Sequence, residues 1–395
     1  MSPAVHPRKI VFINQFYWPD NAPTAVLLDQ TVRHATGQGH EVTVICGRSG
    51  YVEGSSDSPP AARICRVPSL PFSRNPISRL MSWGSFLLFA TVRLIALGRA
   101  DVIVTMTTPP GLSIVAALLK RRRGAKLWIW EMDVYPDVVI ATGGLSAGSW
   151  IARLLQRVFT WSRRRADGII ALGHCMKERL IAAGVPANRI HIAQNWATDP
   201  GIATFLTPDL PPLRILYSGN LGMAHEVDTI DAVLKSLANE RGIEFVFAGG
   251  GAARAGLEQR CHDAKISNVT FQSYGDPQTF ADNLRSCHVG LVTLREGCVG
   301  TVVPSKVYSL MSAGRPILFI GPKNATPASL VVEHHCGWQF DPGKAPETSA
   351  FLRSLATDRQ RIANAGENAR LAFERHFSRT RGTERVLRTL LGTPC

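Results

Sequence analysis

The chain has 395 residues, of which 45% are hydrophobic and 19% charged, and its formal net charge is +14 at pH 7. This length predicts two domains rather than one compact core, and the ordinary composition excludes a low-complexity or fibrous protein. The eight cysteines include no Cys-x-x-Cys pair, which argues against a zinc site or a disulfide framework and favours a reducing compartment.

The basic excess lies mainly in the first half of the chain. Residues 1–200 hold 23 Lys and Arg against 12 Asp and Glu, and the remaining residues hold 21 against 18. The start, residues 1–9, is short and polar and leads directly into a predicted strand, which is unlike a signal peptide. We therefore expect a cytoplasmic protein.

Strands and helices alternate along the first half. The hydrophobic pattern predicts strands at 9–14, 41–46, 101–105, 126–130, 167–171 and 190–193, and helices at 24–35, 112–122, 151–163 and 176–183. Thr24 is the predicted N-cap of the first helix.

A region without acidic residues separates Asp57 from Asp101 and contains the apolar run 80–97. The run is long enough to test as a membrane span, but Arg93 within it argues against one. A helix rich in Trp, Phe and Leu with arginines at its margins suits the membrane interface, and the alternative is a core helix. We expect a mixed role, with much of the apolar surface packed and Trp83 and the arginine-bearing edge near lipid.

A second basic segment, residues 150–165, has helical periodicity. Its apolar positions are Ile151, Leu154, Leu155 and Val158, and the arginines expected to face solvent are Arg153, Arg157, Arg163, Arg164 and Arg165. Such charge either solubilises the protein or attracts an anionic lipid surface, at about 1 kcal/mol per basic residue. Residues 120–123 form another basic run. The sequence contains no recognisable nucleic-acid-binding module, so we expect no nucleic acid partner.

The second half repeats the alternation after a Pro-rich linker at 208–212. Strands are predicted at 214–217, 245–248, 269–271, 289–293 and 317–320. Two sets of strand–helix units predict an α/β protein with two parallel sheets, each covered by helices on both faces. Ligands of such sheets lie beyond the carboxyl ends of the strands.

Polar or glycine-rich segments follow several predicted strands, at 18–25, 131–133, 218–222, 249–251 and 273–275. Glu131 and Asp133 share one face if their strand persists. They either face a substrate hydroxyl or are satisfied by neighbouring arginines. The glycines allow main-chain N–H groups to approach a phosphate, or they serve only as turns.

The most informative segment is Pro304-Ser305-Lys306-Val307-Tyr308, where a loop with a hydroxyl and an ammonium runs into a short helix that ends at Gly314. A helix start presents unpaired N–H groups and the positive end of the helix dipole. With Ser305 and Lys306 this makes a site for a diphosphate, and the alternative is an ordinary helix start with a solvated lysine.

Taken in order, these segments resemble the family 4 glycosyltransferases, in the bacterial branch that builds O-antigen, capsule and colanic-acid-type polysaccharides. The matching blocks are 12–20, 39–44, 131–137, 217–222, 247–251 and the PSK-x-Y-x-x-M-x-A-G-x-P motif at 304–316. The resemblance implies the GT-B fold, in which two Rossmann-like domains with parallel sheets face across a cleft.

The resemblance also implies a domain division. Residues 1–200 would form the acceptor and membrane-facing domain, and 201–375 the domain that binds the nucleotide sugar. A C-terminal crossover helix at about 376–395 would pack on the first domain. The final helix predicted at 383–391 places Val386, Leu387, Leu390 and Leu391 on one apolar face. The alternative is that this helix caps the second domain.

The implied reaction is retaining transfer of a hexosyl or N-acetylhexosaminyl group from a nucleoside diphosphate sugar, UDP-linked, to a lipid-linked or saccharide acceptor. No metal or other cofactor is expected. The implied partners are the donor, a polyprenyl-diphosphate-linked acceptor and the anionic inner face of the plasma membrane, where the protein would be peripheral. The implied donor-binding residues are Gly219, Asn220, Gly222, Gly250, Tyr274, Ser305, Lys306 and Ser309. The implied catalytic residues are Asp133 and Lys306, and the acceptor-side residues are Asn21, Thr24, Glu131 and Asp133.

The chain departs from the family pattern in three places. Thr301 and Ser309 stand where the wider family has two glutamates, one of which holds the ribose. Asn21-Ala22-Pro23 replaces paired glycines, and Met223-Ala224-His225 lacks the usual cation, which leaves Lys306 as the main cationic candidate. Two alternatives stay open: an isomerase of the same architecture that resembles UDP-N-acetylglucosamine 2-epimerase, and a nucleic-acid-binding protein with a degenerate sugar site.

Overall fold

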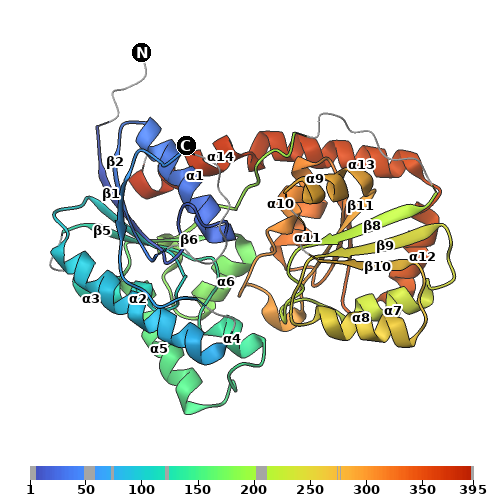
Figure 1. Cartoon of the computed structure of the whole chain (residues 1–395), viewed down its shortest axis with the longest axis horizontal. Coiled ribbons are helices and arrows are strands. Elements are labelled where there is room, and N and C mark those ends of the chain that lie inside the picture. The colour runs from blue at the N-terminus through green and yellow to red at the C-terminus, as the bar shows by residue number, and fades with distance from the viewer. Residues whose placement is uncertain are drawn as a thin grey trace. The chain divides into compact units, whose positions relative to one another are not determined.

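The structure is a computed structural model that describes residues 6–48, 58–72, 75–120, 124–201, 211–273, 275 and 277–392. The chain forms two compact units (Figure 1). The first consists of Met1–Gln194 together with Gly382–Cys395, and the second of Asn195–Arg381. The division after Gln194 lies close to the predicted boundary at residue 200.

The first unit is built on a parallel sheet of seven strands in the part of the chain described, in the order β3-β2-β1-β4-β5-β6-β7. The strands are β1 (Lys9–Ile13), β2 (Glu41–Cys46), β3 (Arg63–Arg66), β4 (Val102–Thr105), β5 (Lys126–Trp130), β6 (Gly168–Ala171) and β7 (Ile190–Ile192). Every residue of β4 and β6 is buried, because helices cover both faces of the sheet.

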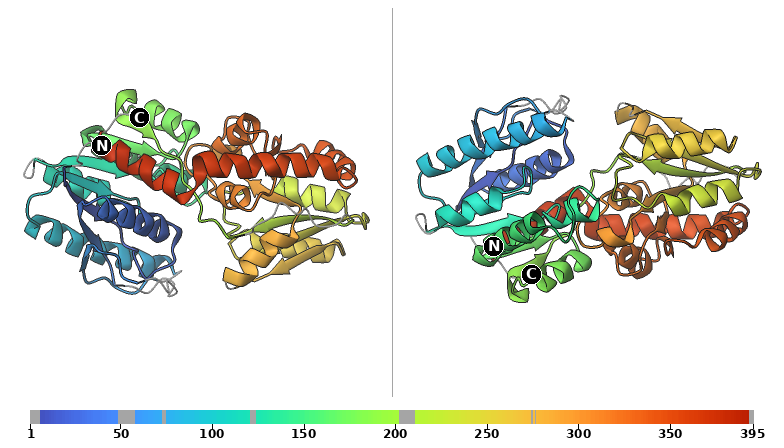
Figure 2. Two further views of the ribbon diagram at one scale, coloured as in Figure 1. Left: turned by 90° about the horizontal axis from the view of Figure 1, so that it is seen from above. Right: turned by 90° about the horizontal axis from the view of Figure 1, so that it is seen from below.

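Helices flank this sheet on both sides, with α1 on one face and α2, α3 and α5 on the other (Figures 1 and 2). The helices are α1 (Pro23–Gly37), α2 (Pro76–Ala96), α3 (Leu112–Leu119), α4 (Asp137–Ala141), α5 (Trp150–Arg165), α6 (His174–Ala182) and the short 3-10 helix η2 (Ala187–Arg189). The predicted cap of α1 is wrong. The N-cap residue is Ala22 and Pro23 opens the helix, since its fixed φ suits the first turn, so Thr24 lies within that turn.

The second unit holds a parallel sheet whose described strands run in the order β10-β9-β8-β11-β12-β13. They are β8 (Leu213–Ser218), β9 (Ile243–Ala248), β10 (Val269–Gln272), β11 (Val289–Thr293), β12 (Ile317–Ile320) and β13 (Gly337–Phe340). The helices are α7 (Asp228–Ser236), α8 (Arg254–Asp263), α9 (Pro277–Ser286), η3 (Glu296–Cys298), α10 (Lys306–Ser312), α11 (Thr326–Glu333), α12 (Ala345–Leu355), α13 (Arg359–Ala372) and the π-helix η4 (Phe373–Phe377).

Alternate side chains of β8 and β9 form the core of this second unit. Ile215 and Phe245 pack with Ile230 and Leu234 of α7 and with Leu352 of α12. The alternate residues of the strands and the apolar face of α7 therefore pack together in one apolar layer. The two parallel sheets confirm the predicted α/β class.

The chain ends in α14 (Arg379–Leu391), and the residues from Gly382 onward belong to the first unit. Val386, Leu387 and Leu390 of this helix are buried, as its apolar stripe predicts, and Leu391 is half-buried. Arg385 Nη1 also donates a hydrogen bond of 2.9 Å to Gln194 Oε1. The last helix is thus part of the same compact unit as residues 1–194.

Candidate functional site

Two glycine-containing loops of the second unit follow β8 and β9 and touch through their backbones. The Gly219 N–H donates to the Ala248 carbonyl over 2.8 Å, and the Leu221 N–H donates to the Gly250 carbonyl over 2.7 Å. A Cβ at Gly249 would lie 2.3 Å from the Gly219 oxygen, and one at Gly251 would lie 2.3 Å from the Leu221 oxygen. These glycines are therefore required for the two loops to meet and are more than ordinary turn residues.

The Lys306 side chain lies directly over the first of these loops. A Cβ at Gly219 would come within 2.6 Å of Lys306 Cε, so the absence of a side chain at Gly219 makes room for the lysine. Lys306 Nζ is 3.4 Å from the Asn220 carbonyl oxygen, to which it donates, and 4.9 Å from the centroid of the Tyr217 ring. Burial lowers the pKa of Lys306 to about 8. No carboxylate in the described part of the chain pairs with this ammonium group.

Tyr217 and His225 complete the surroundings of Lys306. The Tyr217 hydroxyl donates to the Asn220 carbonyl over 2.9 Å, and the His225 ring meets the Tyr217 ring edge-on at 5.7 Å. His225 Nδ1 lies 3.0 Å from the Thr293 carbonyl oxygen. Burial and, secondly, the charge of Lys306 lower the pKa of His225 to about 4, so the imidazole is neutral at pH 7. In the sequence, residues 223–225 were notable only because they lack a cation. The contacts of His225 join neighbouring strand ends, and such contacts leave no pattern in the local sequence.

The remaining donor-side predictions fall on the same unit. Ser305 is exposed at the N-cap position of α10, where its side chain makes no capping hydrogen bond, and Ser309 is half-buried within that helix. Gly222 and Gly250 lie in the two loops, whereas Tyr274 lies outside the described residues. Thr301 is buried and its hydroxyl donates to the Cys298 carbonyl over 2.8 Å, so this position serves a local turn.

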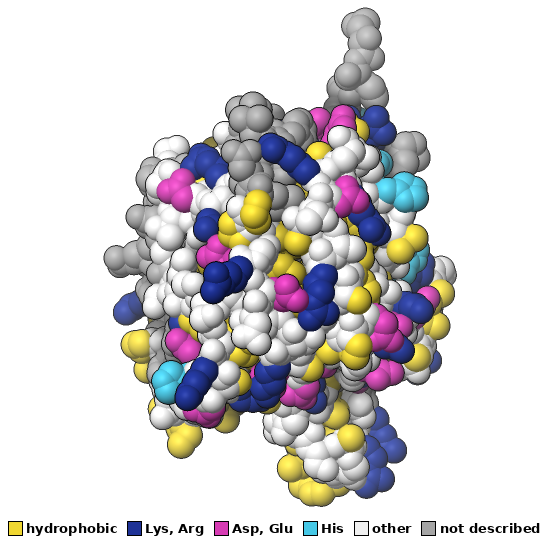
Figure 3. All heavy atoms as spheres, turned by 90° about the vertical axis from the view of Figure 1, so that its right-hand side faces the viewer, with side chains coloured by type: hydrophobic (Ala, Val, Ile, Leu, Met, Phe, Trp, Pro, Cys, Tyr) yellow, Lys and Arg dark blue, Asp and Glu magenta, His cyan; other side chains and the backbone are white. Residues whose placement is uncertain are grey.

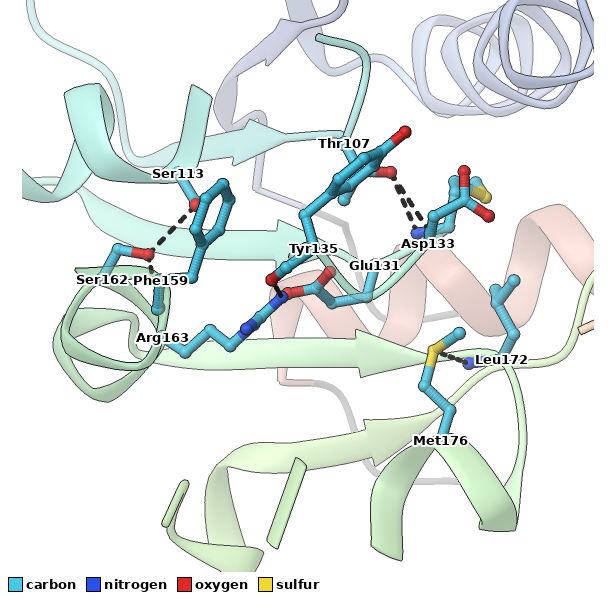
Figure 4. Close-up of polar contacts among 11 residues, drawn as sticks. Thr107, Ser113, Glu131, Asp133, Tyr135, Phe159, Ser162, Arg163, Leu172 and Met176 are labelled. Carbon is cyan, nitrogen blue, oxygen red and sulfur yellow. Dashed lines mark hydrogen bonds and ion pairs between the residues drawn. The ribbon is translucent and has the colours of Figure 1, made fainter. Parts of the chain in front are cut away.

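In the first unit, Glu131 follows β5 and is buried against Arg163 of α5 (Figure 4). Arg163 Nε is 2.6 Å from Glu131 Oε1, and its Nη2 donates to the Tyr135 carbonyl over 2.8 Å. Both charged side chains are at most 3% exposed. The expectation that Arg163 faces solvent is therefore wrong, because it neutralises the Glu131 carboxylate inside the unit.

The Asp133 carboxylate points away from that of Glu131 (Figure 4). The condition for a shared face, that the strand persists, is not met, because β5 ends at Trp130 and the backbone turns, with the Met132 and Asp133 N–H groups directed to Thr107 Oγ1 at 3.3 and 3.4 Å. Burial, and secondly the charge of Glu131, raise the pKa of Asp133 to about 6. Within the described residues the Asp133 carboxylate has no hydrogen-bond or ion-pair partner.

Asn21 and Thr24 lie at the start of α1, after the carboxyl end of β1. Asn21 is exposed and Thr24 half-buried. Arg66 Nη2 donates to the Trp18 carbonyl over 2.6 Å and so holds the preceding loop in place. The structure thus places the acceptor-side set at the strand ends of the first unit and the donor-side set at the strand ends of the second.

Among the residues described, no group of three or more His, Cys, Asp and Glu is arranged to hold a metal ion.

Two parallel sheets, each with ligand-binding loops expected at its strand ends, define the GT-B fold of glycosyltransferases. The crystal structure of Anabaena Alr3699/HepE in complex with UDP and glucose matches with a TM-score of 0.71 and 14% identity, over 98% of this chain and 100% of that chain.

Residues 24–196 match the family model described as a Glycosyl transferase 4-like domain. The "Probable glycosyltransferase WbjE" of Pseudomonas aeruginosa is 29% identical over 289 residues, which cover 69% of this chain and 71% of that protein. The "Putative colanic acid biosynthesis glycosyl transferase WcaI" of Escherichia coli (strain K12) is 25% identical over 337 residues, which cover 78% of this chain and 81% of that protein. These matches support the resemblance to the family 4 glycosyltransferases, and the predicted enzyme class, a glycosyltransferase, is confirmed.

The raised pKa of Asp133 predicts a pH-dependent effect of Asp133→Asn. In the folded protein this carboxyl binds its proton more tightly than in the unfolded chain, so its contribution to stability is present at low pH and lost as the pH rises through about 6. The variant should therefore melt at a higher temperature than the parent protein at pH 8, and the gap should close as the pH falls towards 4. Thermal melts across this range measure the effect.

The exposed Asp263 supplies the control for this measurement, as Asp263→Asn should show no such pH-dependent gap. A gap for Asp133→Asn that is the same at pH 4 and pH 8 would contradict the environment assigned to Asp133.

Proposed function

We propose that the protein transfers a sugar from a nucleoside diphosphate sugar, UDP-linked, to a lipid-linked saccharide in the synthesis of a cell-surface polysaccharide. The observation that carries the proposal is the Lys306 ammonium group, held over the Gly219–Asn220 loop with no carboxylate partner among the residues that the structure describes. The name of WcaI supports a role in polysaccharide synthesis, and the UDP bound to HepE supports the donor class. The similarity to a glycosyltransferase domain and to two glycosyltransferases favours this function over the isomerase alternative.

Lys306 would pair with the diphosphate of the donor. When the bond between the sugar and the diphosphate breaks, negative charge develops on the leaving oxygen, and a nearby ammonium group stabilises that charge. Burial lowers the pKa of Lys306 because it disfavours the charged form, and a bound anion would stabilise the ammonium group and raise that pKa again. Ser305, exposed at the N-cap position of α10, adds a hydroxyl donor at the start of the same helix. We propose that transfer retains the anomeric configuration and needs no metal.

Asp133 is the candidate that would orient the acceptor hydroxyl. Its carboxylate has no partner among the described residues, and it lies at the strand ends of the first unit with Asn21 and Thr24. A carboxylate with a pKa near 6 is mostly ionised at pH 7 and accepts a hydrogen bond from a hydroxyl. Glu131, by contrast, would act by holding Arg163 and the turn that carries Asp133.

Helix α2 supports attachment to a membrane surface. Its buried stripe is narrow and consists of Ser82, Phe86, Ala90 and Leu94. The large apolar side chains that it leaves exposed are Ile77, Leu80, Met81, Leu88, Phe89, Val92 and Ile95. One face of the helix is packed, as expected, but less of its apolar surface lies in the core than the sequence suggested.

By length and composition, residues Ile77–Ala96 could cross a membrane, which alone is weak support for a span. The packed stripe joins the helix to the first unit, and Arg93 Nη2 lies 3.2 Å from Cys65 Sγ in β3. Trp83 is half-buried, with the Arg79 guanidinium 5.3 Å from its ring centroid. We propose that α2 lies in the membrane plane and inserts only its exposed face.

The cysteines and the distribution of charge indicate where in the cell the protein resides. Among the residues described, Cys46, Cys65, Cys261, Cys287 and Cys336 are buried free thiols, which supports a reducing compartment. Charge in residues 1–200 is strongly positive, whereas the side of the second unit near α12 shows Lys and Arg interspersed with Asp and Glu (Figure 3). We propose a peripheral protein at the cytoplasmic, anionic face of the plasma membrane, attached through its first unit.

Substituting Lys306 tests the donor site. We expect Lys306→Ala to weaken UDP binding about tenfold to a hundredfold, because one charge-assisted contact contributes about 1.5–3 kcal/mol. UDP affinity of the parent protein should also fall as the pH rises through about 8, where Lys306 loses its proton. Calorimetric titration at several pH values measures both effects.

The exposed Lys323 of the same unit provides a matched loss of charge, and Lys323→Ala should bind UDP as the parent protein does. Equal UDP affinity for Lys306→Ala and the parent protein would remove Lys306 from the donor site.

Vesicle sedimentation tests the role of α2. We expect vesicles with anionic lipid to bind the protein at low salt and to release part of it at high salt, since salt screens the basic residues but leaves apolar insertion intact. The salt-resistant fraction should be lost in Leu88→Ser/Ile95→Ser, whose positions are exposed.

The control is Phe280→Ser/Val332→Ser, which removes two exposed apolar side chains from the second unit. Equal salt-resistant binding by both double variants would exclude insertion of α2.

A further inference from the structure

A groove between α5 and α6 of the first unit is lined by arginines and is separate from the donor-side loops. Its volume is about 870 Å³, and its cationic lining residues are Arg153, Arg157, Arg164, Arg165 and Arg179. Asp137, which also lines it, already accepts hydrogen bonds from Arg179 Nη2 at 3.2 Å and from Gln156 Nε2 at 3.4 Å. The groove therefore carries a large excess of positive charge.

Three of these guanidinium groups have no acidic counterpart. In the part of the chain that the structure describes, the side chains of Arg153, Arg157 and Arg164 are exposed and make no ion pair. Arg165 is held at 4.6 Å over the Trp161 ring, which fixes its position beside them. Arg153 and Arg157 are four residues apart, so their side chains lie on the same side of α5.

The apolar side chains of α5 also point outward. Trp150, Ile151 and Leu154 are 69%, 42% and 50% exposed, and the helix buries Ala152 and Phe159 instead. The expectation that Ile151 and Leu154 form the packed face is thus wrong. In Figure 3, hydrophobic and basic side chains gather at the lower end of the molecule, where Figure 1 places the start of α5.

The groove lies in the helical layer that also contains α2, with α3 and α5 between them. Helix α3 packs against both α2 and α5, so these three helices form one layer on the sheet of the first unit. Leu118 of α3 is 63% exposed between them. A membrane that receives the apolar face of α2 would therefore bring its phosphate layer to the neighbouring arginines of α5.

We propose that this groove binds the headgroup of a lipid that ends in a phosphomonoester or diphosphate. The proposal rests on the membrane attachment proposed above and specifies one binding site within it. Guanidinium groups bind phosphate oxygens in pairs of parallel hydrogen bonds, and a terminal phosphate offers more free oxygens than a phosphodiester. Several unpaired arginines in one groove therefore favour a multiply charged headgroup over a singly charged one.

The test compares phosphatidylcholine vesicles that contain phosphatidic acid with vesicles that contain enough phosphatidylglycerol to match their surface charge. The full-length protein should bind the phosphatidic acid vesicles more tightly. Arg153→Gln/Arg157→Gln should weaken that binding about tenfold to thirtyfold, from about 1 kcal/mol per basic residue. The control Arg241→Gln/Arg375→Gln removes the same charge from exposed positions of the second unit and should bind like the parent protein.

Each of the following outcomes would contradict the proposal that the groove binds a lipid headgroup. Equal binding to the two charge-matched vesicles, or equal losses in the two double variants, would mean that only diffuse charge acts. Competition by soluble inorganic diphosphate at concentrations similar to those of the lipid would mean a site for free phosphates. If the parent protein binds neither vesicle, the membrane attachment itself fails. The donor-site proposal is tested separately by titration with UDP, because the donor site lies in the second unit and the groove in the first.

Discussion

The donor-side geometry depends on the backbone contact between the loops that follow β8 and β9. Glycines at 249 and 251 allow the second loop to touch the first, where any Cβ would overlap a carbonyl group. The first loop is thereby fixed beneath Lys306, and Gly219 leaves the space that the lysine stem fills. The result is an ammonium group whose position is set by packing rather than by a carboxylate. The Lys306 side chain is thus already ordered before an anionic ligand binds, which lowers the entropic cost of binding.

A different interaction organises the first unit. The buried pair of Glu131 and Arg163 joins the end of β5 to α5, and loss of one partner would leave an uncompensated buried charge that costs about 3–5 kcal/mol. By drawing Arg163 inward, the pair sets the rotation of α5 and turns Ile151 and Leu154 outward with Arg153. The same ion pair thus determines which surface of the helix is exposed.

Much of the fold could be predicted from the sequence because buried parallel strands have a strong local pattern. The predicted bounds of β2, β5, β11 and β12 agree with the structure. β3 and β13 were not predicted. β3 is a short edge strand with two arginines, and β13 begins at a glycine, so neither has the apolar pattern of a buried strand. The helical period of α5 was also correct, but the face that it buries was not, since an arginine partner for Glu131 is invisible in the local pattern.

The candidate site was predictable only in part. Motif order located the Gly219 loop and Lys306, because those segments have distinctive residue types at fixed spacing. Tyr217, His225 and Thr293 were missed because they meet only when neighbouring strand ends are brought together. Glu131 and Asp133 are separated by the turn of the backbone after β5; the strand pattern placed the strand end at Trp130 but could not show that turn.

Hydrogen–deuterium exchange with and without UDP tests the central claim most directly. We expect slower exchange of the amides at 219–225 and 305–309 when UDP is present, because the diphosphate would contact both Lys306 and the loop after β8. Slower exchange confined to other segments, with these two unchanged under saturating UDP, would contradict it.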